Sequence, residues 1–437
     1  MGLEIGETMD FIKIIKNRQE SEPYKYYHYG QDYYVSRNTA IMNRDKKVYV
    51  EGLGVQVNPF GANHKLPSGF FPKIVDQKVM HLLGKGVIFA ESDQTERINT
   101  YFETSFDEFI IDAGVEASKK GEAWAYFYKE NNQLYCTLIP VEQCVPIYDD
   151  YGNLSTMIRH YQDDEGYIIQ VYDENGMTKY LRKDNGEMKK LLDVGHYTTF
   201  KQFNGQVIEE EEQSFTQIPF VPLYNNKERI SDLYRVKPLI DVYDIINSDF
   251  ANNIDDMQDA FFTLKGFTGD TKHLGEFMKQ LKQLKVVPVG DDGEVNAQQL
   301  IIPVEARKTF LDILRKDIYE SSMAVDLSQV SGGTITNVFI KAMFTDLELK
   351  TDKFENEVRK FIFKLLEFIN ENDNQTFTDQ MTFDRSKLMN EAENIEMLMK
   401  LQGLLSQQTL RELLPYDIDL EQELERIRLE SGEVSIE

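Results

Sequence analysis

The fold is decided by one long helical stretch, residues 238–262, which reads PLIDVYDIINSDFANNIDDMQDAFF. At 100° per residue, apolar side chains gather on one narrow face and aspartates on the opposite face. The apolar stripe comprises Leu239, Tyr243, Ile246, Phe250, Ile254, Met257 and Phe261. The acidic face comprises Asp241, Asp244, Asp249, Asp255, Asp256 and Asp259. The pattern predicts an amphipathic helix roughly 37 Å long, with Pro238 in its first turn.

Two more long helices are predicted downstream, at residues 304–325 and 337–370. The apolar stripe of the helix at 337–370, the third long helix, lapses between Leu349 and Phe354, which favours a kink. Residues 263–303 interrupt the helices, and their Gly290-Asp291-Asp292-Gly293 run predicts a turn between two short strands. Helical, acidic sequence returns at residues 386–430, interrupted by Gly403 and Pro415.

The residues that precede this region fall into two parts. Up to residue 120 the pattern is mostly helical, with predicted helices at 71–83 and 96–120. Residues 122–224 alternate strand-like runs with turn signals such as Asn131-Asn132, and they predict an antiparallel β meander. The expected fold class is therefore α+β.

Composition excludes several classes of protein. The 437 residues carry a net charge of −26, whereas a protein that grips nucleic acid needs a basic surface. Any contact with DNA should therefore be weak. The two cysteines, Cys136 and Cys144, lie in apolar sequence and are expected to be buried rather than bonded. No apolar run reaches the ~18 residues that cross a bilayer, so no membrane association is expected.

No motif indicates catalysis. The Ser331-Gly332-Gly333-Thr334 turn lacks the lysine of a phosphate-binding loop, and none of the six histidines pairs with another at helical spacing. The aspartates of 238–262 are more simply the wet side of a helix than a metal site. We expect no enzyme activity and no cofactor, and we keep a metal-dependent enzyme using this face as an alternative.

Six segments together resemble the portal proteins of tailed bacteriophages, in the family typical of long-tailed phages of Gram-positive hosts. They are GFFPKIVDQKVMHLLGKGV at 69–87, IPFVPLYNN at 218–226, LIDVYDIINSDFANNIDDMQDAFFTLKGF at 239–267, IPVEARKTFLDILRKDIYESSMAVDL at 302–327, GGTITNVFIKAMFTDLELKTDKFE at 332–355 and MTFDRSKLMNEAENIEMLMKLQGLLSQQTLRELLP at 381–415. Their order matches the order of parts in that family.

The resemblance implies a portal fold assembled as a ring, with a mixed α/β wing, a two-helix stem, a small α/β clip, a long kinked helix and a helical crown. The implied parts are wing 1–236, stem helix 237–262, clip 263–303, stem helix 304–327, tunnel loop 328–336, long wing helix and return 337–380, and crown 381–437.

The implied function is a channel at one capsid vertex, through which a terminase packages genomic DNA and from which the DNA is later ejected. The implied partners are further copies of the chain, twelve in all, and double-stranded DNA that passes through the channel without sequence specificity. They also include a terminase, a head–tail adaptor, and the major capsid and scaffolding proteins. The implied location is the virion, with the host cytoplasm during assembly. A capsid-associated scaffold without a pore is the other alternative.

Three groups of residues are predicted to serve this function. The DNA-proximal tunnel loop comprises Ser331, Gly332, Gly333, Thr334, Thr336, Asn337 and Lys341. The acidic stem face, which would repel DNA phosphates and keep sliding friction low, comprises Asp241, Asp244, Asp255 and Asp259. The partner contacts of the clip comprise Lys279, Lys282, Lys285, Asp291 and Asp292. For the contact between subunits, the apolar stripes of 239–261 and of the third helix are the candidates.

Overall fold

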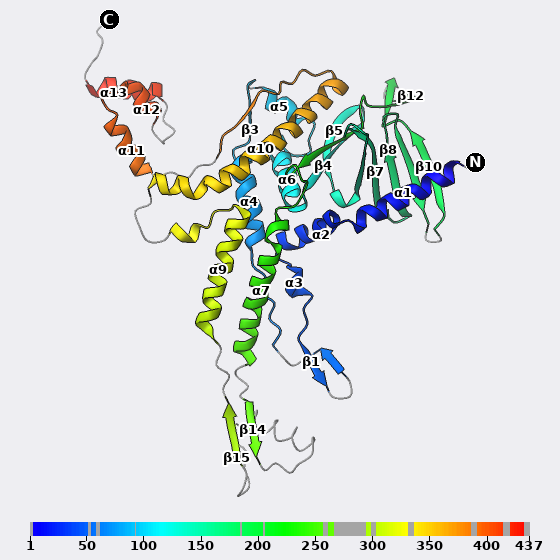
Figure 1. The fold of residues 1–437 in the computed structure, drawn as a ribbon. Helices are drawn as coiled ribbons and strands as arrows, with labels where there is room; N and C mark the ends of the chain where they lie inside the picture. Colours follow the sequence, from blue (N-terminus) through cyan, green and yellow to red (C-terminus); the bar gives the residue numbers. More distant parts are fainter. Residues whose placement is uncertain are drawn as a thin grey trace. The chain divides into compact units, whose positions relative to one another are not determined.

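A computed structural model of the chain forms two compact units (Figure 1). Unit 1 comprises Met1–Gln31, Lys73–Tyr234 and Tyr319–Glu437, and unit 2 comprises Asp32–Pro72 and Arg235–Ile318. The structure describes residues 3–50, 54–57, 62–91, 93–183, 186–203, 206–256, 261–265, 294–298, 303–330, 336–385, 391–413 and 420–431. Within these ranges, no helix combines the length and apolar character that a bilayer crossing requires.

The first part of unit 1 is helical. Its helices are α1 (Leu3–Glu20), α2 (Glu22–Tyr34), α4 (Phe70–Leu83), α5 (Gln94–Asn99) and α6 (Phe106–Lys120). The single helix predicted at 96–120 is therefore wrong, because Ser105 caps a new helix by accepting a hydrogen bond from the Glu108 amide. Gly121, at φ 99°, ends that helix in the left-handed conformation that glycine adopts without strain.

Strands occupy the range predicted for the meander, but they form more than one sheet. In the described residues, β6 (Cys144–Tyr148), β7 (Leu154–Asp163), β8 (Gly166–Tyr172), β9 (Met177–Arg182) and β10 (Met188–Val194) follow one another as an antiparallel meander. A second hairpin joins β11 (Tyr197–Phe203) to β12 (Gln206–Gln213).

The remaining strands of this part make a separate sheet of order β13-β4-β5. Here β4 (Glu122–Glu130) and β5 (Gln133–Ile139) meet at Asn131-Asn132, whose φ angles are 51° and 66°. The chain then returns, and β13 (Phe220–Tyr224) pairs with β4. A simple meander fails because β4 is apolar on both faces and buries both edges of its backbone between β5 and β13.

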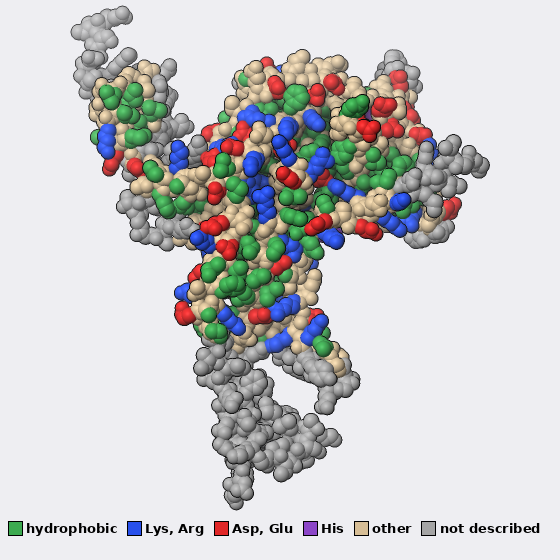
Figure 2. Space-filling view, viewed as in Figure 1, with side chains coloured by type: hydrophobic (Ala, Val, Ile, Leu, Met, Phe, Trp, Pro, Cys, Tyr) green, Lys and Arg blue, Asp and Glu red, His purple; other side chains and the backbone are tan. Residues whose placement is uncertain are grey.

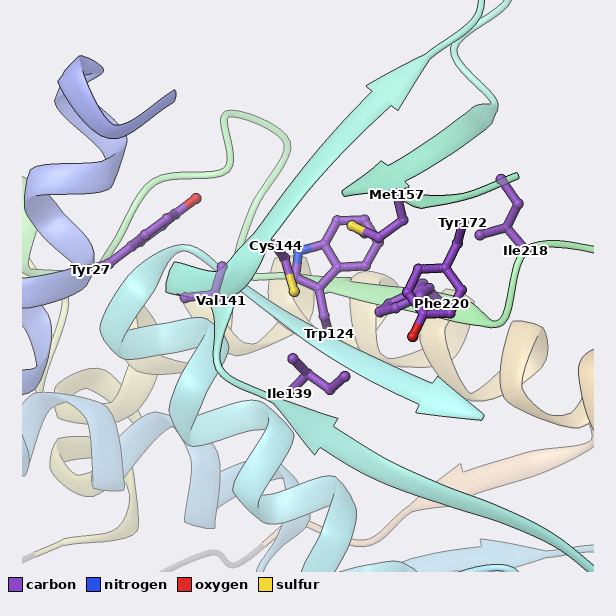
Figure 3. Close-up of a cluster of buried hydrophobic side chains, with 9 residues drawn as sticks. All are labelled: Tyr27, Trp124, Ile139, Val141, Cys144, Met157, Tyr172, Ile218 and Phe220. Carbon is purple, nitrogen blue, oxygen red and sulfur yellow. The ribbon is translucent and has the colours of Figure 1, made fainter. Parts of the chain in front are cut away.

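A core of buried side chains joins these sheets to the helices. Figure 3 shows Trp124 of β4 surrounded by Ile139, Cys144, Met157 and Phe220, which come from different strands. Both cysteines are buried as expected, and burial raises the pKa of each thiol well above its ordinary value. This part of the chain is held by apolar packing.

Helix α10 (Asn337–Asp373) packs against the same core. Phe368 stacks on Phe127 of β4, with ring centroids 4.1 Å apart and an interplanar angle of 9°. The apparent lapse in its stripe is filled by Thr351, which is fully buried. The helix continues without a break across this point. The third-helix stripe, one of the candidates for subunit contact, is thus used inside the subunit.

Short strands and helices complete unit 1. Strand β3 (Val87–Phe89) pairs with β16 (Met381–Phe383), and short 3-10 turns cover Val141–Gln143 (η1) and Leu327–Val330 (η2). The C-terminal helices are α11 (Glu391–Lys400), α12 (Gln407–Glu412) and α13 (Leu420–Ser431).

Unit 2 is built on α7 (Leu233–Asp256) and α9 (Val304–Ser322), which run side by side in Figure 1. It also contains α3 (Thr39–Met42) and the hairpin of β1 (Lys47–Val50) and β2 (Gly54–Val57). Beyond the helices, β14 (Phe261–Lys265) pairs with β15 (Glu294–Gln298).

Two predicted boundaries of α7 are wrong. The helix was expected to continue to residue 262, but Phe261 and Phe262 belong to β14, because pairing with β15 outweighs their helical spacing. The helix also starts earlier than expected, so Pro238 lies inside it rather than in its first turn. The Ser231 hydroxyl accepts a hydrogen bond from the Leu233 amide at this earlier start.

Candidate functional site

The polar face of α7 is covered by a segment of its own chain. The backbone amides of His64, Leu66 and Ser68 donate to Asn252 Oδ1 at 2.6 Å, Ser248 Oγ at 3.0 Å and Asp244 Oδ1 at 2.9 Å, respectively. Every second amide of the segment thus meets every fourth residue of the helix. We call this arrangement the amide ladder, and it holds residues 62–69 along α7.

Three other aspartates of α7 contact side chains from the N-terminal part of unit 2. Asp241 accepts from Tyr33 and from Lys237 Nζ, and Arg44 Nη1 lies 3.0 Å from both carboxylate oxygens of Asp249. The Asp255 carboxylate lies 3.0 Å from His64 Nε2.

Asp244 is the most enclosed of these carboxylates, at 0% exposure. Its Oδ2 accepts from Asn38 Nδ2, in addition to the Ser68 amide on Oδ1. Burial raises the pKa of Asp244, although these hydrogen bonds act in the opposite direction.

The prediction of an open acidic face is therefore wrong for Asp244, and it needs correction for its neighbours. Asp241 and Asp255 bind groups of residues 33–64 instead of forming a bare wall. Asp259 lies outside the described residues. The physical reason is that a row of acceptors on a helix can accept hydrogen bonds either from the amides of an adjacent loop or from water. The helical spacing of the acceptors is the same in both cases, so periodicity does not distinguish them. In the described residues, no group of three potential ligands is placed to hold a metal ion.

The apolar stripe of α7 is likewise engaged within unit 2. Tyr243 packs edge-on against Phe70, with ring centroids 4.9 Å apart, and the Arg307 guanidinium of α9 lies 5.7 Å from the Phe250 ring. This stripe was the other candidate for subunit contact, and Tyr243 and Phe250 already have partners within the subunit, whereas Ile254 is 52% exposed.

Thr336, Asn337 and Lys341 lie at the start of α10. Thr336 is the N-cap, and its hydroxyl accepts from the Phe339 amide at 3.3 Å. The Asn337 amide donates to Glu393 of α11 at 2.5 Å, and Lys341 is exposed. A carboxylate at this position also complements the positive end of the helix dipole.

The other predicted site residues lie outside the described ranges. They are Ser331, Gly332, Gly333 and Thr334 of the tunnel loop and Lys279, Lys282, Lys285, Asp291 and Asp292 of the clip.

A buried ion cluster in unit 1 was not predicted from the sequence. Asp232 Oδ2 lies 2.7 Å from Lys78 Nζ and 3.2 Å from Lys350 Nζ, while Asn225 donates to Asp232 Oδ1 at 3.0 Å. Burial, reinforced by Lys350 and opposed by Asp232, lowers the pKa of Lys78 to about 8. Burial would raise the pKa of Asp232, but the two ammonium groups outweigh it and hold this pKa below its usual value.

A second ion cluster centres on Arg385, just after β16. Its guanidinium contacts Glu348, Asp352 and Glu355, three carboxylates at successive turns of α10. The Glu348-Asp352-Glu355 spacing of i, i+4 and i+7 was visible in the sequence as an acidic face, but its cation comes from a separate segment.

The family model "Phage portal protein, SPP1 Gp6-like" matches residues 13–437. The "Portal protein" of Clostridium phage phiCD119 is 27% identical over 95% of this chain and 93% of its own length. The "Portal protein" of Bacillus phage SPP1 is 26% identical, covering 92% and 83%.

A solved structure titled "Neck of native GTA particle computed with C12 symmetry" is also similar, with a TM-score of 0.44, 9% identity, and coverage of 79% of this chain and 88% of that chain. The family match is the decisive comparison, because it extends over nearly the whole sequence. The chain therefore belongs to the family of phage portal proteins, ring-forming structural proteins of the virion that occupy the capsid vertex where DNA is packaged.

Proposed function

We propose that twelve copies of this chain form the ring through which double-stranded DNA enters the capsid and later leaves it, and that the chain itself has no enzyme activity. The observation that carries the proposal is the family match across residues 13–437. In this assignment α7 and α9 form the stem, residues 263–303 the clip, residues 1–236 the wing and residues 381–437 the crown.

The proposed DNA-proximal element is the loop before α10, with Thr336, Asn337 and Lys341 at its edge. Lys341 offers a single exposed cation, which attracts phosphates without the many counterion-releasing contacts that would hold DNA in place. The net charge of −26 supports passage without a sequence-specific grip.

The acidic residues of α7 have a different proposed role from the one that their periodicity suggested. Since Asp241, Asp244 and Asp249 bind residues 33–68, their main contribution is to hold that segment on the stem. Repulsion of DNA would then come from other acidic side chains of the ring, and Asp→Lys changes at these positions would act first on folding.

The proposed partners of the clip are a terminase during packaging and a head–tail adaptor afterwards, with the residues Lys279, Lys282, Lys285, Asp291 and Asp292 as contacts. The proposed partners of the outer ring are the major capsid and scaffolding proteins. Assembly would take place in the host cytoplasm before the ring becomes part of the virion.

The test is to purify the full chain and examine it by native mass spectrometry and electron microscopy. We expect twelvefold rings with an axial hole wide enough for duplex DNA. A monomer at every protein and salt concentration, or a closed particle without a hole, would contradict the proposal.

A further inference from the structure

The surface of unit 2 carries an unusual combination of charge and apolar side chains. A cavity of about 390 Å³ is lined by residues of α7 and α9 and by residues within 41–47 and 63–65. Its charged lining comprises Arg44, Lys46, Lys47, Lys65 and Arg307 against Asp45 and Asp249. Positive residues therefore predominate here, on a chain whose net charge is −26.

Part of this positive charge is left over inside the subunit. Arg44 is paired with Asp249, and Lys65 donates to the Met42 carbonyl at 2.6 Å. Lys47 is exposed, and no carboxylate pairs with it in the described part of the chain. Arg307 Nη1 is buried and has no hydrogen-bond acceptor among the described residues. A guanidinium with an unsatisfied N–H gains from an added carboxylate.

A second, apolar cavity of about 330 Å³ adjoins the first. It is lined by Ile246, Asp249, Ala306, Arg307 and Phe310, so the two cavities share Asp249 and Arg307. Figure 2 shows hydrophobic side chains gathered over the part of unit 2 where α7 and α9 lie. We call the two cavities together the stem surface.

The apolar side of the stem surface follows one stripe of α9. Ala306, Phe310 and Ile313 recur at helical spacing, and Phe310 and Ile313 are 45% and 50% exposed. Burying such side chains against another apolar surface is favourable, because it removes them from water. The α7 stripe also exposes Ile254, at 52%, but its Tyr243 and Phe250 have partners within unit 2. The stripe of α9 is therefore the better candidate for a contact with another chain.

The combination of basic and apolar side chains on the stem surface favours a protein partner over DNA. A phosphate backbone would match the basic cavity, but it would leave Phe310 and Ile313 without an apolar partner. An aromatic side chain beside an arginine at the centre of a patch is typical of protein–protein contacts.

We infer that the stem surface is one half of the contact between neighbouring copies of this chain, and that it receives an acidic, partly apolar face of the next copy. This inference rests on the proposed ring. The charge supports it, since any two copies repel at −26 each unless local opposite charges meet. The basic cavity provides such a place on one side of every subunit, and a head-to-tail ring needs only one such half per subunit.

The test compares the full-length chain with matched variants in native mass spectrometry, at one protein concentration and moderate salt. Phe310→Asp with Ile313→Asp should lower the fraction of chains in rings by at least tenfold. Val304→Asp is the control, because Val304 lies on another side of α9 and is similarly exposed, at 49%. It should assemble like the unaltered chain.

The charge is tested by a second matched pair. Arg307→Glu should also reduce rings by at least tenfold, whereas Lys308→Glu, one residue along and outside both cavities, should not. Since Arg307 also packs over Phe250, Lys47→Glu on the exposed hairpin repeats the test without disturbing a packed side chain.

The outcomes separate the two proposals. If the unaltered chain forms no ring, the proposed function fails. If it forms rings and the variants form them equally well, the ring stands and the inference about the stem surface is overturned. Normal rings that fail only to enter capsids would also overturn it, because the surface would then face a capsid protein.

Discussion

The buried Asp232 cluster predicts an asymmetry between two substitutions that each break the same ion pair. Asp232→Asn leaves Lys78 and Lys350 facing each other without an anion, and Lys78 is only 1% exposed. Removing one partner of a buried pair costs about 3–5 kcal/mol. This is a large share of the stability of an ordinary domain, which is about 5–15 kcal/mol.

Lys78→Met should cost much less. The fall in the pKa of Lys78 from 10.5 to about 8 corresponds to about 3 kcal/mol against the charged form, and this burden disappears with the ammonium. Asp232 keeps Lys350 and Asn225, and the methionine can pack on Phe354, over whose ring the Lys78 ammonium lies at 4.3 Å. We expect a loss below about 2 kcal/mol.

The assay is urea unfolding followed by fluorescence of Trp124, which is the single tryptophan and is fully buried in the same unit. Lys85→Met is the control, because it removes an exposed ion pair with Asp384 and should change stability by less than about 0.5 kcal/mol. If Lys78→Met proves as costly as Asp232→Asn, the view that Asp232 is the group on which the cluster depends is refuted.

Three further outcomes are expected. The loss in free energy of unfolding caused by Asp232→Asn should be about 1 kcal/mol smaller at pH 3 than at pH 7. A carboxyl whose pKa is lowered by folding contributes its full stability above about pH 3.8, and this contribution falls below that pH. An equal loss at both pH values would contradict the lowered pKa of Asp232. Ser248→Ala removes the acceptor of the Leu66 amide, so hydrogen exchange of that amide should accelerate roughly tenfold, and unaltered protection would argue against the amide ladder. Gly121→Ala should cost about 2 kcal/mol or more in thermal unfolding, because its Cβ would lie 2.5 Å from the Arg229 carbonyl oxygen; Gly186→Ala, also at positive φ but in open space, should cost less.

Periodicity predicted the elements better than their partners. The helix expected at 71–83 is observed at Phe70–Leu83, because its apolar spacing and the glycines after it are local signals. The same local signals failed at 96–120, where the Ser105 cap was hidden among apolar residues that fit a helical period on either side.

The role of the acidic face of α7 was harder to predict, because it depends on residues that are distant in the sequence. Asp241, Asp244 and Asp255 stand at helical spacing whether water, DNA or residues 33–68 cover them, so the sequence could not distinguish these possibilities. Residues Ser248 and Asn252 continue the same row four residues apart, and small polar acceptors in such a row were a signal that the face binds donors. The family relationship came from segments in a fixed order, which single-residue chemistry does not supply.

The amide ladder pairs two chain segments whose repeat lengths are similar but not equal. Two residues of an extended chain advance about 6.6 Å, whereas four residues of an α-helix advance about 6.0 Å. Each rung therefore adds about 0.6 Å of misfit, so the match lasts for the three rungs at 64, 66 and 68 and would be lost within a few more. The register is consequently sensitive to parity: deleting one residue from 62–68 would turn the donors away from α7, while deleting two would move them by one whole rung. We therefore expect that natural variation in the length of this segment occurs in steps of two.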